Sequence, residues 1–318
     1  MGVSLMLLSA AVEQFLLALE ANGRSCRTVS TYEWRLSDFR RFLSARGITS
    51  VEALKPGDLD AWAVALRRQS ERWADHPTRP VCNGGLSPAS IAGRIQAVKT
   101  FLAWCARRGY LAQSPAAHLQ KPRLDLDASD RVMDADDLRR LVAEAMKLAR
   151  GGQRLALRDL ALISFIAETG CRPGEALSLR VGWLDLANLE AMVKGKRGKR
   201  TVDYTLATAD ALRAWLAVHP GGRRVFVNRS GEPLTESGLY QVFKRLAKAA
   251  SVAGRFNPQS VRHLVGQMFT DRANLELARD KLGHSSVTTT AQFYAHQDRE
   301  RLRQATHRLS LIGPDADA

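Results

Sequence analysis

Residues 257–294 read NPQSVRHLVGQMFTDRANLELARDKLGHSSVTTTAQFY, and the rest of the chain is interpreted outward from this stretch. The proline near its start begins a helix on which Gln259 and Arg262, three residues apart, share one face. His263 lies about 100° further around that helix, beside apolar residues, so we expect it to pack in the core rather than to act in catalysis. The helix thus presents an amide and a guanidinium on the same side.

A second short helix is expected to end at Gly283, because glycine is the usual residue beyond a helix C-terminus. His284 follows that end directly, and Tyr294 comes ten residues later. A guanidinium, an imidazole and a phenol gathered in one segment suggest chemistry on a phosphodiester, since Arg offers phosphate a planar fork of donors and Tyr can serve as a nucleophile. Taken alone, a tyrosine beside Phe293 is more often a core aromatic.

The chain is strongly basic and has 318 residues, enough for two domains with a core each. Its 47 Lys and Arg outnumber 32 Asp and Glu, which gives a net charge of +15 and a pI near 10.2. This excess favours a nucleic acid as partner, with an anionic membrane surface as the second choice. No run approaches the roughly 18 apolar residues of a membrane-spanning helix, and the N-terminus lacks the basic start of a signal peptide. We therefore expect a cytoplasmic protein with no membrane contact.

Residues 11–120 carry apolar side chains at helical spacing and are predicted to be helical. The last of these helices begins at Pro88. Its apolar side consists of Ile91, Ile95, Val98 and Leu102. The other side is expected to show Arg94 and Lys99, with Arg107 at the helix end. These cations form either a solvated face or a surface that contacts a nucleic-acid backbone, and the overall basicity makes the two interpretations equally good.

The helical pattern lapses over residues 114–134, where prolines and an alternation of Leu with Asp leave no period. We expect an N-terminal helical domain over 1–120, a linker over 121–133 and a second domain over 134–318. Four acidic residues lie where the second domain starts: Asp130, Asp134, Asp136 and Asp137. They are interpreted as helix capping rather than as a metal site. Four scattered cysteines indicate neither a disulfide framework nor a zinc site.

A turn over residues 169–175, TGCRPGE, leads into another helix, with Pro173 in the first helical position. Arg172 lies at the start of that helix, next to backbone N–H groups that favour a phosphate. The alternative is an ion pair between Arg172 and Glu175, three residues on. Both can hold, with Glu175 orienting the guanidinium.

Residues 191–193 and 201–205 are predicted to be short strands around a cationic hairpin tip, and residues 225–227 are predicted to be a third strand. The cations of the tip are Lys194, Lys196, Arg197, Lys199 and Arg200, and the two residues between them are glycines. So dense a positive run suggests a hairpin that lies on phosphates, the alternative being a solvated turn. The fold class is mainly α with a small β-sheet.

These motifs, taken in order, resemble the tyrosine recombinase (phage integrase) family, including its Xer-type enzymes. They are TGCRPGEAL at 169–177, the Lys-Gly-Lys hairpin, Arg262-His263, LGHSS at 282–286 and QFYAH at 292–296. The N-terminal helical region is similar to the family's core-binding (SAM-like) DNA-binding domain, so the resemblance covers almost the whole chain. Each motif alone is weak, but all of them in this order are specific. The resemblance implies an N-terminal helical core-binding domain, an α+β catalytic domain and double-stranded DNA as partner.

The resemblance also assigns roles, position by position. Arg172 and Arg262 match the arginines that clamp the scissile phosphate. Lys196 matches the general acid toward the 5′-hydroxyl leaving group, His284 the donor histidine, and Tyr294 the nucleophile that forms a 3′-phosphotyrosyl link. The implied chemistry needs no metal, ATP or other cofactor, because two guanidiniums and an ammonium stabilise the charge that develops on phosphorus.

Two positions depart from the family's pattern. Gln259 stands where a histidine is usual, and glutamine can bind a phosphate oxygen but cannot take a proton near neutral pH, so slower cleavage is expected. Tyr294 lies ten residues after His284, where nine is common. Phe293 occupies the ninth position, but it has no nucleophile, so Tyr294 is preferred. A final helix over 298–311 is expected either to pack on its own domain or, as in family members, to dock on a neighbouring subunit of a cyclic tetramer.

We therefore expect a site-specific DNA recombinase associated with the nucleoid, which assembles on DNA as a homotetramer or with a related recombinase subunit. Two alternatives stay open. A type IB topoisomerase-like nicking and closing enzyme would use the same chemistry, whereas Gln259 raises the alternative of a catalytically weakened or inactive DNA-binding member of the family. The separate N-terminal domain and the final helix favour recombination over topoisomerase activity.

Overall fold

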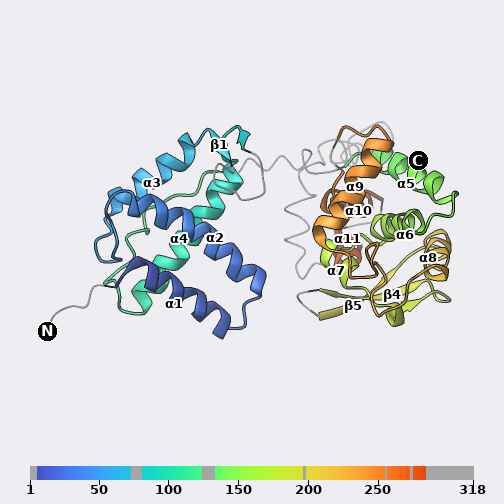
Figure 1. The fold of residues 1–318 in the computed structure, drawn as a ribbon, viewed down its shortest axis with the longest axis horizontal. Helices are drawn as coiled ribbons and strands as arrows, with labels where there is room; N and C mark the ends of the chain where they lie inside the picture. Colours follow the sequence, from blue (N-terminus) through green and yellow to red (C-terminus); the bar gives the residue numbers. More distant parts are fainter. Residues whose placement is uncertain are drawn as a thin grey trace, which may run out of the picture. The chain divides into compact units, whose positions relative to one another are not determined.

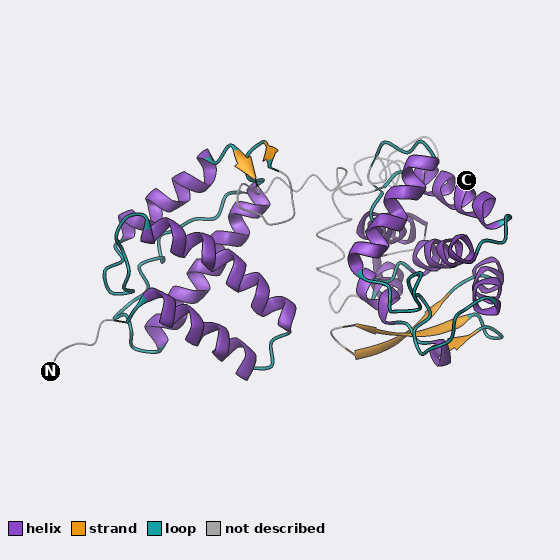
Figure 2. Cartoon of the chain, viewed as in Figure 1, coloured by secondary structure: helices purple, strands orange, loops and turns teal. Residues whose placement is uncertain are grey.

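A computed structural model shows a mainly helical chain with a small antiparallel sheet, as predicted (Figures 1 and 2). The chain divides into two compact units, Met1–Leu126 and Asp127–Ala318, each with its own hydrophobic core. Of the helices in the described part of the chain, none has the length and apolar content needed to cross a bilayer. The structure describes residues 6–72, 81–123, 133–195, 198–254, 256–272 and 275–283.

The described residues of the first unit form four helices: α1 (Leu8–Ala21), α2 (Cys26–Ser44), α3 (Pro56–Arg68) and α4 (Pro88–Arg107). Serine side chains cap two of them, since Ser25 accepts from the backbone N–H of Thr28 and Ser87 accepts from that of Ser90. Aromatic rings fill the centre; Phe39 and Trp62, for example, meet edge to face at 4.9 Å. Two short strands, β1 (Glu71–Arg72) and β2 (Cys82–Asn83), pair within a region that carries no strand signal in the sequence.

The second unit contains seven described helices: α5 (Ala135–Ala149), α6 (Arg154–Thr169), α7 (Pro173–Ser178), α8 (Leu206–Ala217), α9 (Glu236–Ala249), α10 (Pro258–Arg272) and α11 (Leu275–Leu282). Asp134 caps α5, because its carboxylate accepts from the backbone N–H groups of Asp136 and Asp137. The capping interpretation of this acidic cluster is thus confirmed for Asp134. No group of three or more His, Cys, Asp or Glu side chains is arranged to hold a metal among the described residues. Gly283 has a φ of +63° and ends α11, as predicted.

A three-stranded antiparallel sheet lies in the second unit, in the order β3 (Leu184–Asp185), β4 (Glu190–Gly195) and β5 (Gly198–Asp203). The β4–β5 hairpin is the one predicted from the cationic run. The third strand was misplaced, because residues 225–227 are buried but form only an isolated bridge, between Val227 and Pro233.

Candidate active site

Arg172 and Glu175 meet at the start of α7. Gly170 ends α6 in the left-handed conformation, with a φ of +58°, and Arg172 is the N-cap of α7. Glu175 Oε2 accepts from the backbone N–H of Arg172 at 2.9 Å, and its Oε1 accepts from Arg172 Nη1 at 3.0 Å. The expected ion pair is therefore present. Glu175 is only 3% exposed, whereas the side chain of Arg172 is 44% exposed and faces solvent in part.

Arg262 joins this turn to the end of α11. It is 2% exposed, and its Nη1 donates to the carbonyl of Gly170 at 2.7 Å while its Nη2 donates to the carbonyl of Leu282 at 2.7 Å. These two carbonyls lie 92 and 20 residues away from Arg262 in the sequence, so no single motif contains both. A single guanidinium thus holds together the two segments from which the predicted site residues Arg172 and His284 extend.

Arg200 is a third arginine of the cluster. From the sequence it was grouped with the hairpin-tip cations expected to lie on phosphates. Instead Nη2 donates to Glu175 Oε2 at 3.0 Å and Nη1 to the carbonyl of Lys281 at 3.0 Å, with the side chain 21% exposed. The alternation of side chains along a strand predicts this inward position, because Arg200 lies two residues before buried Val202 and therefore shares its face.

The cluster has an excess of positive charge. Three guanidiniums, those of Arg172, Arg200 and Arg262, interact with the carboxylate of Glu175, which leaves a net charge of about +2 for these four side chains. Burial, together with repulsion from Arg172 and Arg200, lowers the pKa of Arg262 to about 10, although the attraction of Glu175 partly opposes this shift. Burial raises the pKa of Glu175, but the N–H of Arg172 and the guanidinium of Arg200 outweigh it and bring that pKa below 4.5. The arrangement favours an incoming anion.

Gln259 lies on the exposed face of α10, one turn before His263. Its Nε2 is 3.4 Å from Nε2 of His263, whose side chain is half-buried. His263 thus lies at the edge of the core rather than fully inside it. The amide at position 259 is accessible from solvent, as a residue that binds a phosphate oxygen must be.

The outer side of the hairpin carries Lys194 and Lys199, both exposed and directly opposite each other in the strand register. Like charges in directly opposed positions destabilise a sheet. The ammonium of Lys199 also lies 5.3 Å from the ring centre of Trp183. This face therefore concentrates positive charge at some cost in stability, which an anionic partner would relieve.

Two cations of the first unit differ from expectation. Arg94 is not on the outer side of α4: it is 5% exposed, its Nε donates to Asp38 at 3.0 Å, and its guanidinium lies 4.5 Å from the ring centre of Trp34. Lys99 is half-buried and donates to the carbonyl of Leu119 at 2.7 Å. Only Arg107 is exposed as predicted.

Several predicted residues lie outside the described part of the chain. They are Lys196, Arg197, His284, Tyr294 and the expected final helix over 298–311. The described cluster is consequently the part of the predicted site formed by Arg172, Glu175 and Arg262, with Arg200 added.

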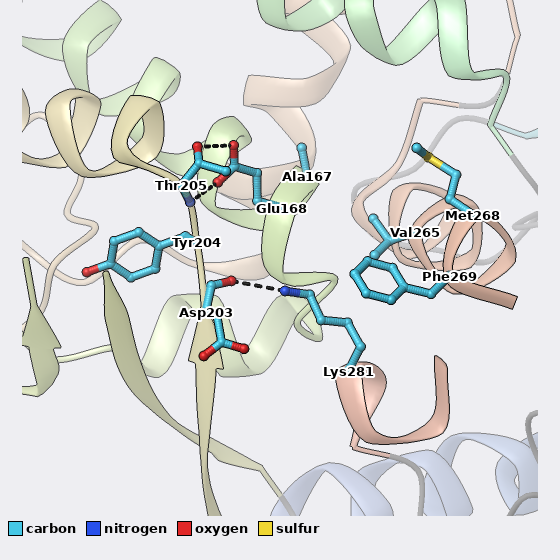
Figure 3. A pocket seen from close by; sticks show the side chains of 9 residues that line it. All are labelled: Ala167, Glu168, Asp203, Tyr204, Thr205, Val265, Met268, Phe269 and Lys281. Atoms are coloured by element: carbon cyan, nitrogen blue, oxygen red, sulfur yellow. Dashed lines mark hydrogen bonds between the residues drawn. The ribbon is translucent and has the colours of Figure 1, made fainter. Parts of the chain in front are cut away.

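A pocket of about 360 Å³ is lined in part by Lys281 (Figure 3). The ammonium of Lys281 donates to the carbonyl of Asp203 at 3.0 Å, and Glu168 accepts from the backbone N–H and the hydroxyl of Thr205. The same ammonium lies 5.4 Å from the ring centre of Phe269. Its lining contains none of the candidate catalytic residues that the structure describes, which are Arg172, Glu175, Gln259 and Arg262.

The fold and the cluster define a two-unit, mainly helical protein with a guanidinium-rich site suited to a phosphate. Residues 131–301 match the model of the phage integrase family, and residues 12–109 match that family's N-terminal SAM-like domain. The chain therefore belongs to the phage integrase family, the family of tyrosine recombinases.

Individual relatives agree with this assignment. Tyrosine recombinase XerC of Mycobacterium tuberculosis (strain ATCC 25177 / H37Ra) is 33% identical over 303 residues, which cover 92% of this chain and 95% of XerC. XerC of Xylella fastidiosa (strain 9a5c) is 30% identical over 297 residues, which cover 92% of this chain and 93% of that XerC. Among solved structures, the Tn1549 transposon integrase in complex with transposon right end DNA shares the fold, with a TM-score of 0.73 at 18% identity over 96% of this chain and 100% of that one. XerH bound to palindromic difH substrate has a TM-score of 0.70 at 20% identity, over 94% of this chain and 84% of the XerH chain.

Proposed function

We propose that this protein is a site-specific DNA recombinase that cleaves and rejoins DNA through a 3′-phosphotyrosyl intermediate. The observation that carries the proposal is the cluster in which Arg172 and Arg200 both donate to the buried carboxylate of Glu175, with the buried guanidinium of Arg262 held in the same site. Segments far apart in the sequence converge to build it, and its net positive charge is suited to one phosphate. Family membership and the XerC relatives support the same conclusion.

In the proposed reaction the phenol of Tyr294 releases its proton to solvent water as its oxygen attacks the scissile phosphorus and forms a new P–O bond. The bond from phosphorus to the 5′ oxygen breaks, and Lys196 gives that oxygen its proton. Arg172, with His284, donates to the non-bridging oxygens as charge develops on them, and buried Arg262 adds its positive charge to the site. The link to tyrosine keeps the energy of the phosphodiester, so the 5′-hydroxyl of another strand can displace Tyr294 without ATP. Metal and other cofactors have no part in this scheme.

Gln259 takes the place of a histidine in this scheme. It can donate its amide N–H to a phosphate oxygen, and its exposed position on α10 supports that role. It cannot act as a base near neutral pH. We infer an active enzyme whose cleavage step is slower than that of an otherwise identical chain with histidine at this position.

DNA backbone contacts are proposed for the exposed hairpin cations Lys194 and Lys199, for Arg197 between them in sequence, and for Arg107 at the end of α4. Lys99 is assigned a supporting role, because carbonyl oxygens already hold its ammonium. Arg94 is left out, since it is buried and ion-paired. Arg200 is reassigned to the interior of the site.

The proposed partners are double-stranded DNA and further recombinase subunits. One structure with this fold is a lambda integrase tetramer bound to a Holliday junction, with a TM-score of 0.67 at 16% identity. We propose a comparable tetramer on DNA here, formed by this chain alone or with a related recombinase, and acting on DNA in the cytoplasm at the nucleoid.

The test begins by selecting tightly bound duplexes from a random pool, which identifies a binding site directly from affinity. Two labelled duplexes of different length that carry this site are then incubated with the protein in EDTA and without ATP. Recombinant products of the predicted new lengths support the proposal. Binding with no strand cleavage would favour the inactive DNA-binding alternative. Relaxation of a supercoiled plasmid with no exchange of strands would favour the topoisomerase-like alternative.

A further inference from the structure

We propose that Arg200 is a positioning residue, which locks the end of α11 to the Arg172–Glu175 pair so that both sides of the phosphate site keep one geometry. This inference rests on the proposed recombinase function. It gives Arg200 a task inside the protein, in place of the contact with DNA that its position in a cationic hairpin suggests.

Arg200 makes a pair of hydrogen bonds that reach two different helices. Its Nη2 donates to Glu175 Oε2, the same oxygen that accepts from the backbone of Arg172, and its Nη1 donates to the carbonyl of Lys281. One planar guanidinium therefore spans α7 and α11 from a third element, β5. Arginine suits this task because its donors are fixed in a rigid fork.

The last carbonyls of α11 have no partner within their own helix. Arg200 binds the carbonyl of Lys281 and Arg262 binds that of Leu282, so two guanidiniums hold two consecutive carbonyls of the last turn. Cations are favourable at a helix C-terminus. These contacts therefore fix the end of α11 and the position of Gly283, which follows it.

Two glycines, Gly195 and Gly283, lie in close contact with the side chains of this cluster. A Cβ built on Gly283 would lie 2.7 Å from both Cδ and Nε of Arg200, and a Cβ on Gly195 would lie 2.6 Å from Glu175 Oε1. The side chain of Arg200 thus lies directly on the backbone at the end of α11, and the other hairpin strand lies directly on the carboxylate. The hairpin whose tip contains Lys196 is therefore held against the site at both strands.

Arg200 is also less exposed than the other described cations of its hairpin. The side chain of Arg200 is 21% exposed and both its terminal nitrogens already donate within the protein, whereas Lys194 and Lys199 of the same hairpin are exposed. The buried Nε has no hydrogen-bond partner among the residues that the structure describes. The side chain is therefore held by its two ends, and lysine, which presents a compact ammonium, cannot reproduce the two-sided contact.

The test compares Arg200→Gln and Arg200→Lys with the matched control Arg245→Gln. Arg245 also donates to a buried carboxylate, that of Asp159, which keeps a second arginine partner just as Glu175 does. Measurements are the DNA dissociation constant, its salt dependence, and the single-turnover cleavage rate at saturating DNA. Hydrogen exchange at the backbone N–H of Arg172 reports the geometry without reference to activity.

We expect Arg200→Gln to cleave about 10- to 100-fold more slowly, the loss typical of a misplaced reactive geometry, with a dissociation constant within about twofold of wild type. Arg200→Lys should be intermediate, Arg245→Gln should cleave normally, and exchange at Arg172 should accelerate only in the Arg200 variants. A weaker dissociation constant with a salt slope reduced by about 1 would instead show a direct phosphate contact and overturn the proposal. Normal cleavage by Arg200→Gln would also overturn it. Failure of the wild type to cleave would count against the recombinase function itself, and unchanged exchange at Arg172 would still refute the positioning role.

Discussion

Replacing Glu175 by glutamine removes the one negative charge from the arginine cluster while keeping the shape of the side chain. Glutamine can still accept from the backbone N–H of Arg172, but its NH₂ group then faces a guanidinium with donor against donor. The ion pair with Arg172 is 44% exposed on the arginine side and contributes at most about 1 kcal/mol. The bond to Arg200 is more enclosed, and a hydrogen bond to a charged group contributes about 1.5–3 kcal/mol. We therefore expect Glu175→Gln to lower the free energy of unfolding of the second unit by about 2–4 kcal/mol.

Calorimetry of the full chain measures this loss, and a unit of this size loses about 2–4 °C of Tm for each kcal/mol. Asp210→Asn is the control, because Asp210 pairs with Arg213 at the same three-residue spacing and the arginine is again 44% exposed, but the carboxylate is itself 64% exposed. That variant should change the free energy of unfolding by less than about 0.5 kcal/mol. Equal effects of the two substitutions would refute the claim that burial inside the cluster makes Glu175 important.

The same variant tests a dependence on pH. The pKa of Glu175 is lower in the folded protein than its ordinary value of 4.5, so the folded state binds this proton less well than the unfolded state. The stabilisation is thus fully present above pH 4.5 and is lost as the pH falls through the lower, folded value. Wild type should therefore lose stability relative to Glu175→Gln in acid. If the difference in free energy of unfolding between wild type and Glu175→Gln stays constant from pH 7 to pH 3, this assignment is contradicted.

Three further outcomes are expected. Lys194→Gln and Lys199→Gln should each weaken binding to all DNA sequences alike and reduce the slope of log Kd against log salt by about 1; an unchanged slope would remove the residue from the DNA surface. In the folded protein iodoacetamide at pH 8 should modify exposed Cys26 but spare Cys171, because burial raises the pKa of that thiol to about 11, and equal labelling would contradict its burial. Gln259→His should cleave faster than wild type in single-turnover assays; no gain would mean that position 259 does not limit the rate.

The sequence predicted local structure well where periodicity and capping decide it. The start of α10 at Pro258, the cap at Asp134 and the three-residue spacing of Arg172 and Glu175 all depend on neighbours within one or two turns. The contact of Arg262 with the carbonyl of Gly170 joins residues 92 positions apart, and no local pattern encodes it. Only the resemblance to a known family indicates from the sequence that these two segments share one site.

Arg94 and Arg200 were predicted to contact DNA because of their charge. The spacing of apolar residues around them instead places both on inward faces. Arg94 lies three residues after Ile91 and four before Val98, which places it on the apolar face of α4, where Asp38 and Trp34 receive it. Arg200 shares a strand face with a buried valine in the same way. A basic residue at an apolar position of the repeat indicates a buried partner, and in both cases the partner is a carboxylate.

The central claim is that the arginine cluster presents a phosphate to Tyr294 for covalent attack. The most direct measurement uses a nicked suicide duplex carrying the selected site, which traps the cleaved strand on the protein, and a denaturing gel that separates the covalent complex. The account predicts an adduct with wild type, its loss in Tyr294→Phe, and a DNA-linked peptide that contains Tyr294. No adduct on a duplex that the wild-type protein binds tightly, or an adduct that survives in Tyr294→Phe, would contradict it.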